Sequence, residues 1–112
     1  MNITKTTLDY DEYCTLVNII NEVCNGFYIN NLEKATGFTK QTAIIFFKKI
    51  LQKKGEERAV ELVLEDSEII FIKNSFGEIF KEIDEWEFET RLGVTIPEAL
   101  KIRDKFKTSI SS

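Results

Sequence analysis

The chain has 112 residues, of which 43% are apolar and 30% are charged, and it contains no histidine. This length and apolar content predict one folded domain over residues 1–112, while the absence of histidine excludes histidine-based acid–base catalysis and nucleophile activation. No apolar run approaches the roughly 20 residues that span a bilayer, and the first residues lack the form of a signal peptide, so we expect a cytoplasmic protein without a membrane partner.

The first predicted elements are a short strand and a long helix. Residues 3–8 alternate threonine with apolar residues, which is typical of a strand. Asp9 is placed to cap a helix whose apolar residues recur every three or four positions. Asn25 and Gly26 end this helix, and we expect Gly26 in the left-handed conformation of a helix C-cap.

Two further helices are predicted in the first half of the chain. A short helix covers about residues 31–36, and Thr39 caps a second helix that runs to about residue 54. In this second helix, Ile44 and Ile45 are apolar on a different side from the main apolar stripe. We therefore expect the helix to be covered on more than one face.

A β-hairpin is predicted next. Residues 59–65 alternate in polarity, the following pair has turn chemistry, and residues 68–73 contain a continuous apolar run. A continuous apolar run predicts a strand that is covered on both faces. Together with the first strand, the hairpin would complete a three-stranded antiparallel sheet packed by helices.

The remainder of the chain is predicted to be helical. An apolar stripe over residues 76–83 indicates one helix, and a short helix after it ends at Gly93. Thr95 and Glu98 have the spacing of a capping box, with Pro97 tolerated in the first helical turn. This pattern predicts a final helix that packs through its apolar face.

A short passage occurs twice in the sequence. Residues 32–43 match residues 88–99 at a constant offset, and the identical pairs are Glu33 and Glu89, Gly37 and Gly93, Thr39 and Thr95, and Ala43 and Ala99. We interpret the chain as two pseudo-repeated strand–helix–helix–helix halves, about residues 1–55 and 66–108, related by a pseudo-twofold axis. The predicted fold class is therefore α+β.

Residue types that carry chemistry are sparse. The five glycines are widely spaced and form no phosphate-binding loop. Cys14 and Cys24 lie about 15 Å apart on one predicted helix, which is too far for a disulfide. Two cysteines without histidine cannot complete a tetrahedral metal shell, so we interpret both as small buried residues. We expect no cofactor, no metal and no enzymatic activity.

Charge is distributed unevenly along the chain. Residues 1–55 hold five acidic and seven basic residues, a net charge of +2, whereas residues 56–112 hold fourteen and eight, a net charge of −6. The densest acid stretch repels nucleic acid and attracts a basic partner, although most charge runs are only solvated helix faces. For its tryptophan, core packing beside Phe88 is the competing interpretation. The candidate partner-binding residues are Glu78, Glu82, Asp84, Glu85, Trp86, Glu87 and Glu89.

DNA binding is the alternative function. Residues 32–51, followed by the predicted hairpin, resemble a winged helix-turn-helix. The lysines that could contact phosphates are Lys40, Lys48, Lys49, Lys53 and Lys54. However, Glu33 stands where a small residue normally packs between the two helices, and only Thr39, Lys40 and Gln41 are available to read bases. We therefore favour a helix-turn-helix shape that is used for packing.

Two segments carry a resemblance to a known group of proteins. Residues 21–26 read NEVCNG, and residues 87–95 read EFETRLGVT, followed by Glu98 and Ala99. These segments resemble small bacterial immunity proteins of contact-dependent growth inhibition and other polymorphic toxin systems. The resemblance implies an acidic, cytoplasmic, non-enzymatic antitoxin. Its partner would be one basic toxin domain, commonly a nuclease, bound one-to-one with its active site or substrate groove blocked.

Overall fold

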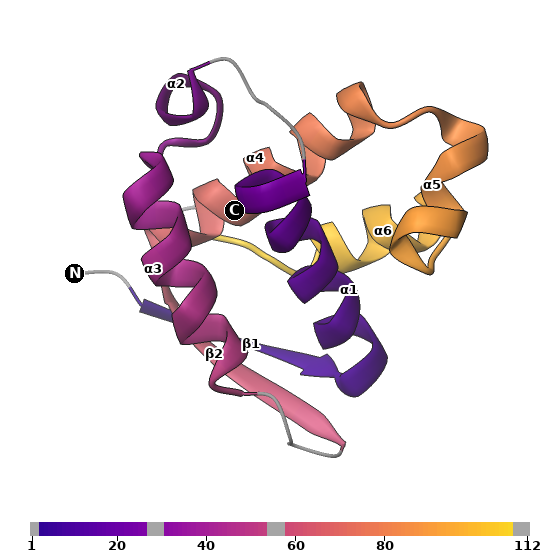
Figure 1. The fold of residues 1–112 in the computed structure, drawn as a ribbon. Coiled ribbons are helices and arrows are strands. Elements are labelled where there is room, and N and C mark those ends of the chain that lie inside the picture. Colours follow the sequence, from indigo (N-terminus) through magenta and orange to yellow (C-terminus); the bar gives the residue numbers. More distant parts are fainter. Residues whose placement is uncertain (1–2, 27–30, 54–57, 109–112) are drawn as a thin grey trace.

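The computed structural model describes residues 3–26, 31–53 and 58–108, which form an α+β arrangement of helices packed on a small sheet (Figure 1). Figure 1 shows α2 and α3 on one side of the molecule and α5 on the other, with α1 between them. In chain order the elements are β1 (Ile3–Asp9), α1 (Tyr10–Asn21), the π-helical turn η1 (Glu22–Gly26), α2 (Leu32–Thr36), α3 (Lys40–Leu51), β2 (Ala59–Glu65), α4 (Asp66–Glu82), α5 (Glu85–Leu92) and α6 (Ile96–Arg103).

The described sheet consists of β1 and β2, which pair antiparallel and without a bulge. The register runs from Ile3 opposite Glu65 to Asp9 opposite Ala59. Side chains alternate across the sheet, so that one face is buried under helices and the other is exposed. The buried face consists of Thr6, Leu8, Val60, Leu62 and Leu64. Both strands agree with the sequence prediction.

The third predicted strand is wrong, because residues 68–73 lie within the helix α4. The predicted hairpin and three-stranded sheet are therefore replaced by a strand that leads directly into a helix. A capping box starts this helix: the Glu65 N–H donates to Glu68 Oε1 at 2.8 Å, and the Glu65 side chain accepts from the Glu68 N–H.

The apolar run itself follows a helical period in the structure. Ile69, Ile72, Phe76 and Ile79 are buried at spacings of three and four residues, whereas Ile70 is 47% exposed. A strand covered on both faces would have hidden Ile70 as well. The two glutamates that form the capping box thus indicate the helix better than the β-branched residues indicate a strand.

The predicted helix caps are confirmed at most positions. The side chains of Asp9, Thr39 and Thr95 each accept a hydrogen bond from the backbone three residues later. Gly37 and Gly93 have left-handed backbones, with φ of 93° and 79°.

The predicted cap at Gly26 is wrong. Its backbone is not left-handed, because α1 continues into the π-helical turn η1 instead of ending in a C-cap. That wider turn places Gly26 against the carboxylate of Glu22, where an added Cβ would collide.

The core joins the helices that cover the sheet. The Tyr13 hydroxyl of α1 donates to the Ile50 carbonyl of α3 at 2.8 Å. Phe38 stacks on Phe71 with ring centroids 4.6 Å apart, which ties the start of α3 to α4. Ile45 is 62% exposed, so the expectation that α3 is covered on more than one face is wrong at that residue.

Candidate partner-binding surface

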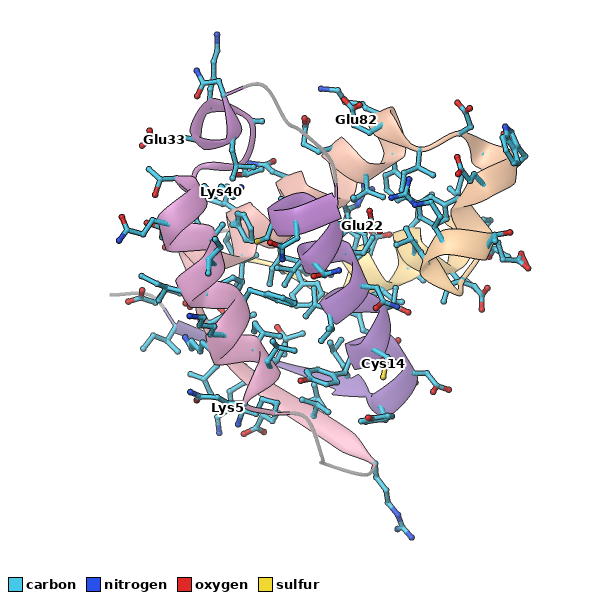
Figure 2. The ribbon with its side chains drawn as sticks, viewed as in Figure 1. Lys5, Cys14, Glu22, Glu33, Lys40 and Glu82 are labelled. Atoms are coloured by element: carbon cyan, nitrogen blue, oxygen red, sulfur yellow. The ribbon has the colours of Figure 1, made fainter. Side chains whose placement is uncertain are left out.

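The acid stretch covers the end of α4, the connection after it and the start of α5. We call it the acidic surface and define it as Glu78, Glu82, Asp84, Glu85, Trp86, Glu87 and Glu89. Most of its members are exposed, while Glu78 and Glu87 are half-buried. Figure 2 shows Glu82 at the end of α4 and Lys40 at the start of α3.

Helix α5 is fixed to the core by its apolar side. Phe88 and Leu92 are 0% and 2% exposed, and the Phe88 ring stacks on Phe80 with centroids 5.5 Å apart. Because residues four apart share one face of a helix, these two side chains hold the same face of α5 against the core. Trp86 precedes Phe88 by two residues and therefore points away from that face.

Trp86 is 78% exposed, the largest exposure among the large apolar residues of the described chain. The competing interpretation, core packing beside Phe88, is therefore wrong. An isolated exposed apolar residue needs no explanation by itself. Here the tryptophan projects from the face of α5 opposite the one that Phe88 holds against the core, and it lies between Glu85 and Glu87 in the sequence.

Carboxylates in the first turn of α5 suit the positive end of the helix dipole. Glu85 and Glu87 occupy that turn, and the Asp84 carbonyl accepts the first helical hydrogen bonds, from the Glu87 and Phe88 N–H groups at 2.9 and 3.1 Å. The Asp84 side chain makes no cap hydrogen bond. Lys81 reduces the negative charge of the acidic surface locally, because its Nζ pairs with Glu78 Oε2 at 3.0 Å.

An ion pair joins the two segments on which the family resemblance rests. Arg91, in the last turn of α5, donates to Glu22 of η1 at 2.5 Å, across 69 positions of sequence. The same Glu22 carboxylate lies against Gly26. The sequence analysis did not predict this contact. Its only sequence signal was that Glu22 and Arg91 both belong to the resembling motifs.

The helix-turn-helix segment is present in outline, but it departs from the predicted winged arrangement. Helix α2 has five residues and packs against α4. Glu33 is exposed and so does not fill a helix–helix interface. The predicted wing is absent from the described residues, since its second strand is part of α4. Of the lysines considered for phosphate contacts, Lys54 lies outside the described residues.

A cavity of about 340 Å³ between α1 and α6 is lined by carboxylates, most of which already serve the fold. Asp9 and Glu12 form the capping box of α1, and Glu12 also pairs with Lys105. Glu98 accepts from the N–H and hydroxyl of Thr95, and these hydrogen bonds lower the pKa of Glu98. Within the described ranges, no group of His, Cys, Asp and Glu could hold a metal ion.

The cysteines differ in their surroundings, and both are free thiols. Cys24 is buried as predicted, and its burial raises the pKa of the thiol, with Lys40 opposing the shift. Cys14 is half-buried, so its predicted burial is only partial. It lies beside Tyr10 at an apolar cavity of about 130 Å³, and its hydrogen bond raises the pKa of the Tyr10 hydroxyl.

In comparisons with protein-family models, curated proteins and solved structures, no match to this chain is found. Among the helices that the structure describes, none is both long and apolar enough to cross a membrane.

Proposed function

We propose that this protein is a non-enzymatic immunity protein that binds one cognate toxin domain through the acidic surface. Binding there would occlude the active site or substrate groove of the toxin, which we expect to be a basic nuclease in the cytoplasm. The observation that carries the proposal is the 78% exposure of Trp86, which lies between acidic residues of α5 in the sequence. Tryptophan is enriched among the residues that dominate interface energies.

Charge supports a nuclease as the partner. A nuclease must attract the phosphate backbone, so the rim of its substrate groove is positively charged. The carboxylates around Trp86 offer that groove an array of negative charges in place of phosphates. Complementary charge also accelerates association, which suits a protein that must stop a toxin before the toxin acts.

The packing of α5 supports a preorganised surface. Phe88 and Leu92 hold the helix from the core side, and Arg91 ties its last turn to Glu22. A binding surface that is already ordered loses less conformational entropy when the partner binds. Arg91 therefore acts as a positioning residue, which holds α5 in place without facing the partner.

The test replaces the proposed anchor. Tagged protein is purified from its native cells, the co-purifying toxin is identified, and the isolated toxin domain is titrated against Trp86→Ala. Loss of a central aromatic anchor typically costs 2 kcal/mol or more, so we expect affinity to fall by about thirtyfold. Ile45→Ala is the matched control, because Ile45 is also exposed and apolar but lies on α3. Co-expression with the toxin measures protection of cells.

A second experiment distinguishes the effect of the acidic surface from the effect of net charge alone. Reversing Glu82, Asp84, Glu85 and Glu87 to lysine should slow association and abolish protection, while the fold is retained because exposed substitutions change stability little. The control makes the same total change in charge at exposed acids elsewhere, namely Asp11, Glu33, Glu61 and Asp104. Equal affinity of Trp86→Ala and wild type, or full protection by the reversed surface, would refute the proposed interface.

We also propose that the two halves of the chain arose by duplication and are related by a pseudo-twofold axis. Three observations support this. Both halves have the order strand, long helix, short helix, helix when β2, which lies before the predicted second half of residues 66–108, is taken as the opening strand in place of residues 68–73. The left-handed glycines Gly37 and Gly93 are 56 positions apart, since 93 − 37 = 56. Thr6 pairs with Leu62 across the sheet, also 56 apart, since 62 − 6 = 56.

A further inference from the structure

A groove runs between the end of α3 and the strand β2, away from the acidic surface. Its volume is about 230 Å³, and its lining residues are Lys49, Ile50, Gln52 and Lys53 of the helix side and Leu62, Val63 and Leu64 of the strand. Figure 1 shows the last turns of α3 crossing over β2, which places helix and strand as the two walls.

The strand wall of this groove is formed by three consecutive residues of β2. Consecutive side chains of a strand point to opposite faces, and Leu62 and Leu64 are buried while Val63 is 46% exposed on the other face. Leu62, Val63 and Leu64 all line the same groove, so we infer that the part of β2 facing the groove is its backbone edge. The opposite edge of β2 pairs with β1 along its whole length. The groove therefore follows the edge of β2 that no described strand occupies.

This edge is suited to accept another strand. Natural sheets usually block such edges with a proline, a bulge or an inward charge. β2 pairs with β1 residue by residue over seven positions without a bulge, and the single proline of the chain lies elsewhere, at Pro97. An extended peptide could continue the ladder of main-chain hydrogen bonds here, as in recognition by strand addition.

The helix wall selects the charge of the incoming strand. Lys49 and Lys53 border the groove, and no acidic side chain lines it. Lys49 pairs with Glu68 at 3.0 Å, yet its side chain remains 52% exposed and open to a second carboxylate. On the outer face of the sheet, Glu61 and Glu65 are exposed and would repel carboxylates. The fitting strand thus carries its carboxylates on the side that faces α3.

We propose that this groove binds an extended acidic segment of a partner protein, which adds to β2 as a third strand and directs alternate carboxylates toward Lys49 and Lys53. Main-chain pairing supplies the affinity, and the lysines select the sequence. The site is independent of the acidic surface and does not rest on the proposed immunity function.

The test uses a labelled peptide of about ten residues that alternates threonine and glutamate, the length of a long strand. Binding is measured by fluorescence anisotropy, and amide hydrogen exchange is measured across the whole protein. We expect exchange to slow in residues 59–65, and we expect a peptide of equal charge interrupted by prolines to bind at least about tenfold more weakly, because proline cannot join the ladder.

Substitutions of Lys49 and Lys53 test whether the helix wall takes part in peptide binding. Lys49→Glu with Lys53→Glu should weaken binding of the peptide about tenfold or more, and Lys49→Gln with Lys53→Gln should weaken it less while avoiding new repulsion. Lys48→Glu is the matched control, since Lys48 is exposed on the same helix but does not line the groove. It should change affinity by no more than about twofold.

Three outcomes would overturn the proposal. The first is equal binding of the peptide with and without prolines, which would indicate charge attraction alone. The second is equal weakening by the Lys48 variant and the groove variants. The third is protection of residues 59–65 that rises with protein concentration when no peptide is present, because the edge would then be filled by a second copy of this chain.

Discussion

At the scale of single residues, a buried hydroxyl stands at the centre of the sheet. Thr6 is 5% exposed, and its Oγ1 has no hydrogen-bond partner among the described residues. Leaving a buried polar group unsatisfied costs about 1–3 kcal/mol. Thr6→Val keeps the branched shape and removes the hydroxyl, so we expect the free energy of unfolding to rise by about 1 kcal/mol in urea denaturation.

A second threonine provides the control for this prediction. Thr36 is fully buried, but its hydroxyl donates to the Leu32 carbonyl at 2.8 Å and accepts from the Phe38 N–H at 3.3 Å. Thr36→Val should therefore lower the free energy of unfolding by about 1 kcal/mol. If Thr6→Val lowers the free energy of unfolding as Thr36→Val does, the Thr6 hydroxyl is satisfied in solution.

Single residues also show how far the sequence could predict the candidate site. The exposure of most carboxylates in the acid stretch could be predicted, because ionised side chains are rarely buried, while their role in binding a partner stays a prediction. The orientation of Trp86 could not be predicted, since a lone tryptophan usually buries most of its area. Its exposure follows from Phe88, whose burial fixes the rotation of α5.

At the scale of elements, alanine substitutions at three glycines distinguish the energetic cost of backbone strain from the cost of steric contact. An added Cβ meets nothing within 4 Å at Gly37, Gly77 or Gly93, so only the backbone conformation decides the effect of alanine. Gly37 and Gly93 have positive φ, and we expect each alanine variant to lower the free energy of unfolding by about 1 kcal/mol and by similar amounts. Gly77→Ala, inside α4, should raise it by up to about 1 kcal/mol.

Thermal and urea denaturation of the three variants test these values. Similar losses at Gly37 and Gly93 are what duplicated halves would give, because the same cap follows the same short helix in each half. A loss at only one of them would count against the pseudo-twofold relationship. A loss at Gly77 would contradict its place in an unstrained helix interior.

Prediction of helix starts succeeded where an N-cap was recognised and failed where it was not. Asp9, Thr39 and Thr95 marked helix starts correctly, because a side-chain oxygen before a helix satisfies otherwise unpaired N–H groups. Residues 66–67 were interpreted as a turn, although Glu65 and Glu68 have the capping-box spacing that begins α4. The π-helical turn at η1 has no recognised sequence pattern and could not be predicted.

At the scale of the whole molecule, the charge asymmetry of the sequence becomes an asymmetry in space. In Figure 1, α3, which carries Lys40, Lys48 and Lys49, and α5, which carries Glu85, Trp86, Glu87 and Glu89, lie on opposite sides of the molecule. This polarity argues against duplex DNA as a partner, because the acidic half repels the phosphates that the lysines attract. We expect no binding to duplex DNA in fluorescence anisotropy at physiological salt.

The salt dependence of DNA binding distinguishes nonspecific charge attraction from recognition of a DNA sequence. Any binding at low salt should be independent of DNA sequence and should vanish as salt rises, since it would come only from counterion release by the lysines. Lys48→Glu, which alters α3 alone, reports whether that helix is responsible. Submicromolar, sequence-dependent binding at physiological salt would contradict the proposed function and favour the DNA-binding alternative.

The pairing of β1 with β2 also determines when the sheet can form during folding. Thr6 meets Leu62 only after the intervening helices have brought the two strands together. Closing so long a loop carries an entropic cost that grows with loop length, whereas the helices depend mainly on local contacts. The sheet is therefore expected to assemble last. Substitutions in the strands should act chiefly on the rate of unfolding and leave the rate of folding almost unchanged.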